Sequence, residues 1–183
     1  MLQMTNEYGI ELIKIIERLR LTWYDDGFGF RTIGYGHTPD KYFPFREGEK
    51  ISIQQADDIL LNDLKEAEWI VKRELNVDEM NHFQTSALVS IAFNSGSFKN
   101  YNKKQDKWYP SDLMLAINEG KPKEVIAPML MYHDVYSGGN LSKGLLRRRR
   151  CERALFDLDN YDVPPEAWAR QIYMEWFGKK GVA

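Results

Sequence analysis

The 183-residue sequence has one cysteine, no long hydrophobic run and almost no net charge. The single cysteine, Cys151, excludes an internal disulfide, so the fold does not depend on an oxidising compartment. No stretch approaches the roughly 18 consecutive apolar residues that a membrane-spanning helix needs. The first residues are polar, without a basic segment followed by an apolar one, so we expect no signal peptide.

The net charge is −2 and the isoelectric point is about 6.0, and no nucleic-acid-binding motif is present. These features argue against a nucleic-acid-binding protein. The charge is nevertheless uneven, since residues 1–80 hold 10 Lys and Arg against 16 Asp and Glu, whereas residues 81–183 hold 15 against 11. This asymmetry suits two lobes that attract each other or a basic surface for an anionic polymer, and unevenly distributed solvated charge is the alternative.

Hydrophobic periodicity and capping residues predict a mainly helical chain. The sequence Ser52-Ile53-Gln54-Gln55 predicts a capping box, and Asn81 with Gln84 repeats that device. A polar, lysine-rich loop is expected at 97–110. Helices are predicted over 6–20, 52–75, 83–94, 111–120, 142–158 and 166–177, with one more beginning near Pro122.

The glycine-rich stretch after the first helix predicts the only sheet. Short strands joined by glycine turns are expected near residues 30–35. The order of elements predicts an α+β fold in which a small antiparallel sheet lobe, at about 22–50, is inserted into a mainly helical domain. We expect this domain to span 1–161 and a C-terminal amphipathic helical extension to span 162–183.

Three polar residues near the N-terminus suggest a catalytic site. Glu17 follows Ile13 by four positions on the apolar side of the first helix, where lost solvation favours a protonated carboxyl that can donate a proton. Asp26 begins the glycine-rich stretch, and Thr32 on a strand offers a hydroxyl that can hold a water molecule. A sheltered acid with a hydrated carboxylate is the pair that glycoside hydrolysis uses. On chemistry alone Asp25 rivals Asp26, and a surface role for Glu17 is the alternative.

The same segment resembles the active-site signature of phage-type lysozymes of glycoside hydrolase family 24. The likeness continues through the predicted helices as far as about Phe156, where Gly138-Gly139, Lys143-Gly144-Leu145, Arg148-Arg149 and Glu152 are similar to the C-terminal signature of the family. The signature residues at the N-terminal end are Glu17, Tyr24, Asp26, Gly29, Thr32 and the run Ile33-Gly34-Tyr35-Gly36-His37.

This resemblance implies a muramidase, a lysozyme of the endolysin type that cleaves the β-1,4 bond between N-acetylmuramic acid and N-acetylglucosamine in peptidoglycan with inversion. It implies that Glu17 is the general acid and that Asp26, rather than Asp25, acts with Thr32 on the attacking water. No metal and no cofactor are implied. A cationic partner for Glu17 is expected from the arginine run 147–150.

Arg148 is the residue we assign to that partner, with Arg147 and Arg149 left open, and a solvated basic helix face is the alternative for the run. The resemblance also implies a structural pair between His37 and Asp63. Residues assigned to substrate binding are Phe93, Asn94, Gly34 and Tyr35, and a place in the helix core is the alternative for Phe93.

Two departures from the family pattern are visible. Arg18 stands where the family often has glycine after the catalytic glutamate, and residues 100–110 look like an insertion near the lip of the cleft. The C-terminal extension has two interpretations, a helix that closes the core or a helix that contacts an anionic outer-membrane surface.

The sequence therefore predicts a monomeric endolysin, made in the host cytoplasm and released through a holin-type pore to act on the periplasmic cell wall. A lysozyme-like domain that binds peptidoglycan or a partner without cleaving it is the alternative. The complete set of Glu17, Asp26 and Thr32 favours the enzyme. A membrane-active carrier would depend on the terminal helix alone.

Overall fold

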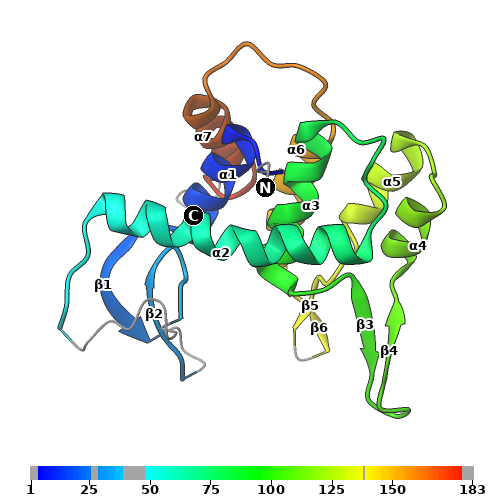
Figure 1. Cartoon of the computed structure of the whole chain (residues 1–183), viewed down its shortest axis with the longest axis horizontal. Helices are drawn as coiled ribbons and strands as arrows, with labels where there is room; N and C mark the ends of the chain where they lie inside the picture. The colour runs from blue at the N-terminus through cyan, green and yellow to red at the C-terminus, as the bar shows by residue number, and fades with distance from the viewer. Residues whose placement is uncertain (1–3, 26–28, 39–47, 138, 179–183) are drawn as a thin grey trace.

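The computed structural model describes residues 4–25, 29–38, 48–137 and 139–178, and within these ranges the chain forms seven helices and six short strands (Figure 1). Their arrangement confirms an α+β architecture with small antiparallel sheets beside a mainly helical body. Asp26 and Gly138 lie outside the described residues, as do residues 39–47.

The small lobe is built on one antiparallel pair of strands. β1 (Arg20–Asp25) pairs with β2 (Arg31–Gly34), so that Tyr24 lies opposite Thr32. After β2 the chain turns tightly, and Ile33 exchanges backbone hydrogen bonds of 2.9 Å with His37 across the turn. This turn places the residues that follow β2 at the inner edge of the lobe.

Helix α2 (Ile53–Glu74) joins this lobe to the helical body and runs between them in Figure 1. It begins at the predicted capping box, in which the Ser52 hydroxyl accepts from the Gln55 amide at 3.1 Å and the Gln55 side chain accepts from the Ser52 amide at 2.8 Å. Its 22 residues give a length of about 33 Å, long enough to reach from one lobe to the other.

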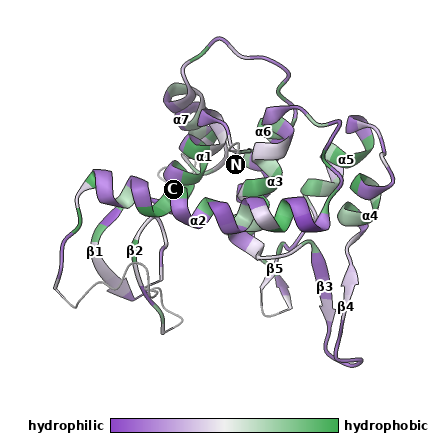
Figure 2. Ribbon diagram, viewed as in Figure 1, coloured by the Kyte–Doolittle hydropathy of each residue, from purple (hydrophilic) through white to green (hydrophobic). Residues whose placement is uncertain are grey.

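Helix α3 (His82–Ser95) is the centre of the helical body. Nine of its residues are buried, and it packs against α1 (Glu7–Glu17), α2 and α6 (Lys143–Phe156). Hydrophobic residues on α1 and α3 face this junction (Figure 2). Helices α4 (Asp112–Asn118) and α5 (Lys123–Leu130) cover the far end of the body.

Two sequence predictions were wrong. The first helix ends at Glu17 and not at residue 20, because Arg18 leaves the helical region with φ 63° and ψ 121°. The predicted loop at 97–110 is a hairpin of β3 (Lys99–Asn102) and β4 (Lys107–Pro110), with Tyr101 opposite Trp108. A second short hairpin consists of β5 (Tyr136–Ser137) and β6 (Asn140–Leu141).

The C-terminal helix α7 (Pro165–Trp176) packs on α1 (Figure 1). Trp168 is buried in this contact, and the Tyr8 hydroxyl on α1 donates to the Val163 carbonyl at 2.7 Å. The helix therefore belongs to the same packed body as the core, while the division of the chain at residue 162 stays a prediction. None of the helices in the described ranges combines the length and the apolar character needed to cross a bilayer.

Candidate active site

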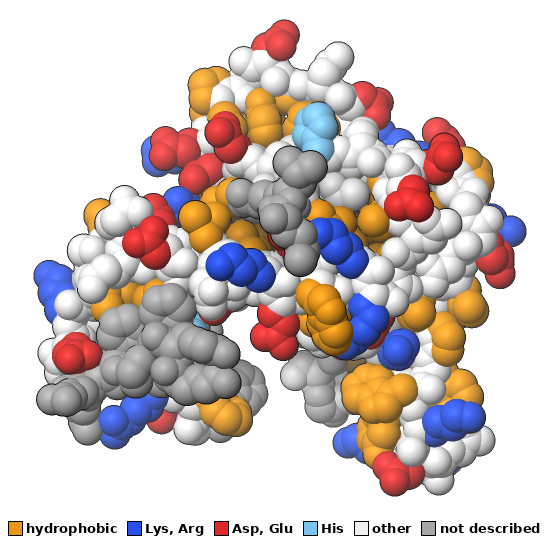
Figure 3. All heavy atoms as spheres, viewed as in Figure 1, with side chains coloured by type: hydrophobic (Ala, Val, Ile, Leu, Met, Phe, Trp, Pro, Cys, Tyr) orange, Lys and Arg blue, Asp and Glu red, His pale blue; other side chains and the backbone are white. Residues whose placement is uncertain are grey.

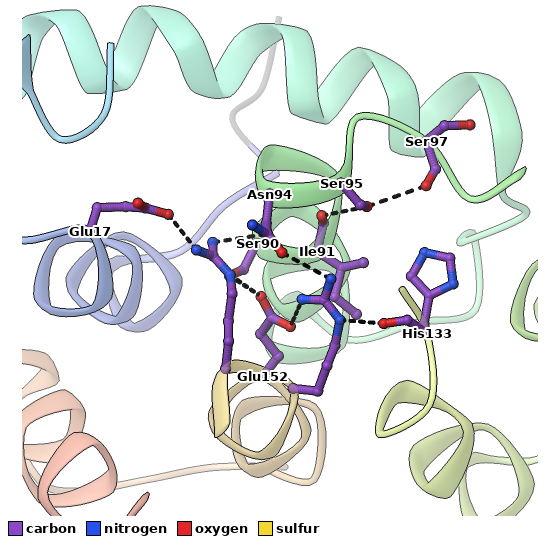
Figure 4. A network of polar contacts seen from close by, with 10 residues as sticks. Glu17, Ser90, Ile91, Asn94, Ser95, Ser97, His133 and Glu152 are labelled. Carbon is purple, nitrogen blue, oxygen red and sulfur yellow. Dashed lines mark hydrogen bonds and ion pairs between the residues drawn. The ribbon is translucent and has the colours of Figure 1, made fainter. Parts of the chain in front are cut away.

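Glu17 is the last residue of α1, and its side chain is 23% exposed. Because the helix ends at this position, the carboxylate projects beyond the helix end toward α3 and α6 (Figure 4). It is therefore half-buried, which agrees with a position on the inner side of α1 but not with complete removal from solvent.

The Glu17 carboxylate is paired with Arg148 on α6. Arg148 Nη1 donates to Glu17 Oε1, while Arg148 Nε donates to Glu152 Oε1 at 2.9 Å and Nη2 donates to the Ser90 carbonyl at 3.2 Å. The Arg148 side chain is almost completely buried. Burial alone lowers the pKa of this guanidinium, but Glu17 and Glu152 outweigh burial and raise the pKa above its ordinary value.

A second arginine completes the network behind Glu17 (Figure 4). Arg149 Nη1 donates to Glu152 Oε2 at 2.6 Å, Nη2 donates to Asn94 Oδ1 at 3.0 Å, and Nε donates to the His133 carbonyl at 2.7 Å. The Ser90 hydroxyl donates to Glu152 Oε1 at 2.8 Å. Since every bond here has a charged partner, the network holds the Arg148 guanidinium in one orientation.

The turn after β2 approaches Glu17 from the small lobe. A Cβ atom built on Gly36 would lie 3.6 Å from Glu17 Oε2, and Gly36 has φ 92°, a conformation that favours glycine. Thr32 is buried on β2, and its hydroxyl lies 3.5 Å from the Tyr24 carbonyl. The structure thus brings the lobe that carries Thr32 up to the acid on α1.

A hollow of about 470 Å³ lies between the small lobe and the helical body, next to this contact. Gly36, His37 and Thr38 line it from the lobe, and Phe93 and Gly96 line it from the end of α3. His37 Nδ1 lies 2.9 Å from Asp63 Oδ2, so the pair predicted from the sequence is formed and ties the lobe to α2. Ligand sites occur preferentially in such concave places between two lobes.

Two of the residues assigned to substrate binding are in the interior instead. Gly34 is buried, and a Cβ there would contact Ile51 and Ala56 at 3.8 Å. Tyr35 is only 8% exposed and belongs to the core. Their burial favours a packing role in the small lobe, and contact with substrate stays a prediction. Asn94 is exposed but its side-chain oxygen is already bonded to Arg149.

Comparison with known proteins identifies the chain. A family model described as phage lysozyme matches residues 14–152, which include all the residues of the network around Glu17. The chain belongs to the phage lysozyme family. This membership makes it a peptidoglycan hydrolase of the muramidase type.

Individual relatives of this phage lysozyme are endolysins. An endolysin of Acyrthosiphon pisum secondary endosymbiont phage 1 is 29% identical over 83% of this chain and 97% of that protein. An endolysin of Bacillus phage PZA is 33% identical over 83% of this chain, which spans about half (54%) of that longer protein. The crystal structure of the active form of P1 phage endolysin Lyz matches with a TM-score of 0.74, at 25% identity over 86% of this chain and 89% of that one.

Glu152 was not singled out for a role in the sequence analysis of this phage lysozyme. It is fully buried and accepts hydrogen bonds from both Arg148 and Arg149. Its spacing of three and four residues from the arginines on one helix is the signal that could have indicated the contact.

Cys151 on α6 is buried close to the arginine network. Burial raises the pKa of the Cys151 thiol to about 12, so this side chain is not a ready nucleophile. Among the residues that the structure describes, there is no group of three His, Cys, Asp or Glu side chains suited to a metal ion.

Proposed function

We propose that this member of the phage lysozyme family cleaves the β-1,4 bond between N-acetylmuramic acid and N-acetylglucosamine by an inverting mechanism, with Glu17 as the general acid. The observation that carries the proposal is the position of the Glu17 carboxylate, between buried Arg148 and Gly36, a residue that lines the hollow between the lobes. One carboxyl oxygen is bonded to buried Arg148, and the other lies toward Gly36.

In this mechanism the protonated Glu17 donates to the glycosidic oxygen as the bond to the leaving sugar breaks. Arg148 then stabilises the carboxylate that forms, because its positive charge is buried beside it. Asp26 takes a proton from a water molecule that Thr32 helps to hold, and this water attacks the anomeric carbon from the opposite face. Attack from that face inverts the configuration.

The first test is hydrolysis of purified peptidoglycan by the wild type, Glu17→Gln and Asp26→Asn. Each substitution keeps the size of the side chain and removes its acid–base function, so we expect turbidity loss to slow by about 10²–10⁴-fold. Circular dichroism and the melting temperature control for folding. Full activity in Glu17→Gln would exclude it as the acid, and binding of the wild type to peptidoglycan without any cleavage would favour the non-catalytic alternative.

The configuration at the newly formed reducing end tests inversion separately. We expect the α-anomer as the first product, observed by NMR before mutarotation. A β-anomer as the first product would contradict the inverting arrangement of Glu17 and Asp26.

The cellular setting is part of the same proposal: a monomer made in the host cytoplasm and released through a holin-type pore. Turbidity of cultures that express the chain with or without a holin tests the route, and light scattering tests the monomer. Contact of α7 with an anionic outer-membrane surface receives less support, because Trp168 and Ala169 are buried in its packing. If lysis of intact Gram-negative cells falls on deletion of 162–183 while the variant stays folded and lyses purified walls normally, membrane contact is favoured.

A further inference from the structure

The β3–β4 hairpin carries large aromatic side chains in exposed positions. Tyr101 is 43% exposed and Trp108 is 56% exposed. They are directly opposite in the register, so both lie on one face of the hairpin, together with Lys99, whereas Tyr109 lies on the other face. Their ring centroids are 5.1 Å apart. Exposed aromatic side chains that gather in this way mark a binding surface more often than a packing fault.

The face with Tyr101 and Trp108 borders a second hollow, of about 350 Å³. Asn100, Ser97 and His133 also line it. His133 is more than nine-tenths buried, and its Nε2 atom has no hydrogen-bond partner among the described residues. Because this nitrogen is covered by protein, His133 contributes to the wall of the hollow and is not itself a contact for a ligand.

This second hollow adjoins the hollow between the two lobes. Gly96 at the end of α3 lines the first, and its neighbours Ser95 and Ser97 line the second. Figure 3 shows the hairpin, with hydrophobic and basic side chains gathered on it, standing across an open space from the small lobe. A polymer that extends from the first hollow past the end of α3 would therefore reach the hairpin.

The lining of the second hollow suits a neutral sugar better than an acidic peptide. Lys99 is the cation on this face, and its ammonium group lies 3.7 Å from the carboxylate of buried Glu74. Lys107 is in register with Asn102 and therefore points to the other face. The two aromatic rings therefore remain for a ligand, and the exposed Asp134 at the rim adds a negative charge that disfavours an acidic ligand.

We propose that the hairpin hollow binds a further sugar of the glycan strand that occupies the cleft, with Trp108 and Tyr101 stacked on the ring. This inference rests on the proposed function. The aromatic rings offer a flat apolar surface to the C–H face of a pyranose. The hairpin thereby extends the substrate site and favours long strands.

The test compares glycan strands freed of their peptide stems, in long and short preparations, as substrates of the full chain. For Trp108→Ala and for Tyr101→Ala we expect kcat/KM on long strands, relative to short fragments, to fall about fivefold to tenfold, through a higher KM. Trp108→Phe keeps an aromatic ring and should retain most of the preference. Tyr109→Ala, on the other face of the hairpin, and Trp69→Ala, at an exposed position on α2, are the matched controls.

The other outcomes of this test either overturn the proposal or assign the surface to a different ligand. An unchanged preference in Trp108→Ala overturns the proposal, as does a loss in Trp108→Phe equal to that in Trp108→Ala. A loss seen only when peptide stems are present assigns the surface to the peptide instead of the sugar. Sedimentation of the same stem-free strands with Glu17→Gln and with Glu17→Gln/Trp108→Ala measures binding without cleavage. Failure of the wild type to cleave would refute the proposed function, and equal binding by these two variants would refute this inference.

Discussion

Arg148 is a buried cation between two carboxylates, Glu17 on α1 and Glu152 on its own helix. Three hydrogen bonds in one plane use the fork of the guanidinium, and lysine has no such fork. Its neighbour Arg147 is only half-buried and lies outside this network.

We expect Arg148→Ala to lower both activity and stability. Removal of Arg148 leaves the buried Glu152 charge with one fewer cationic partner, which lowers the free energy of unfolding by about 3–5 kcal/mol. It also removes the hydrogen bond that orients the Glu17 carboxylate. Arg148→Lys keeps the charge but not the fork and should be intermediate in kcat. The melting temperature and kcat on purified peptidoglycan measure the two effects, with Arg147→Ala as the control. A kcat for Arg148→Ala equal to that of Arg147→Ala would contradict the assignment.

His133 gives the fold a sensitivity to acid. Burial first, and then the charge of Arg149, hold the pKa of His133 below its ordinary 6.5, although Asp134 and Glu152 oppose this. The unfolded chain therefore binds the proton more readily than the folded protein. The contribution of His133 to stability is complete above the unfolded pKa and is lost as the pH falls below about 6.5 toward the folded pKa.

The prediction is that the melting temperature falls between pH 7.5 and pH 5.5 in the wild type and falls less in His133→Gln. Each kcal/mol lost should correspond to about 2–4 °C in a chain of this size. His82→Gln changes an exposed histidine at the start of α3 and serves as the control. An equal pH dependence in wild type and His133→Gln would show that other groups cause it.

Among the elements that carry no site residue, α7 contacts residues next to the site, although it lies beyond the stretch that matches the family model. Tyr173 on α7 accepts a hydrogen bond of 2.5 Å from Arg18, the residue after Glu17. Trp176 packs against the guanidinium of Arg150, two residues after Arg148. The helix therefore contacts both chain segments that carry the Glu17–Arg148 pair.

Arg18 makes this contact important because its φ of 63° is unfavourable for any residue except glycine. We expect Tyr173→Ala to lower kcat and the melting temperature in the wild-type background but to have a smaller effect in an Arg18→Gly background, where the backbone is relaxed. Arg18→Gly alone should retain activity. A double-mutant cycle on kcat measures the coupling. Strictly additive effects would mean that α7 supports the fold without positioning Glu17.

On the scale of the whole molecule, α2 fixes the distance between the small lobe and the helical body (Figure 1). The His37–Asp63 pair attaches the turn after β2 to this helix, and the ion pair of 3.0 Å between Lys14 and Asp57 attaches α1 to it. The hollow between the lobes lies beside Gly36 and Phe93, and the hairpin hollow continues it. The proposed substrate site therefore depends on the spacing of the small lobe, the helical body and the β3–β4 hairpin.

The hydrophobic pattern and the capping residues were sufficient for the α+β class and for the start of α2 and α3, because these depend on local hydrogen bonds and on burial of one helix face. The end of α1 and the β3–β4 hairpin were not predicted. Arg18 takes a strained conformation that only tertiary contacts maintain. The strands β3 and β4 are largely exposed and polar, so they lack the alternation that marks a half-buried strand.

The sequence by itself determined the family of this protein and singled out Glu17 and Asp26 as its candidate acid and base, because the types and spacing of these residues are specific. Only the tertiary structure decided which arginine meets Glu17, that Glu152 holds both Arg148 and Arg149, and that Gly34 and Tyr35 are interior. The physical reason is that hydrogen bonds and burial between distant segments depend on packing, which no local pattern specifies.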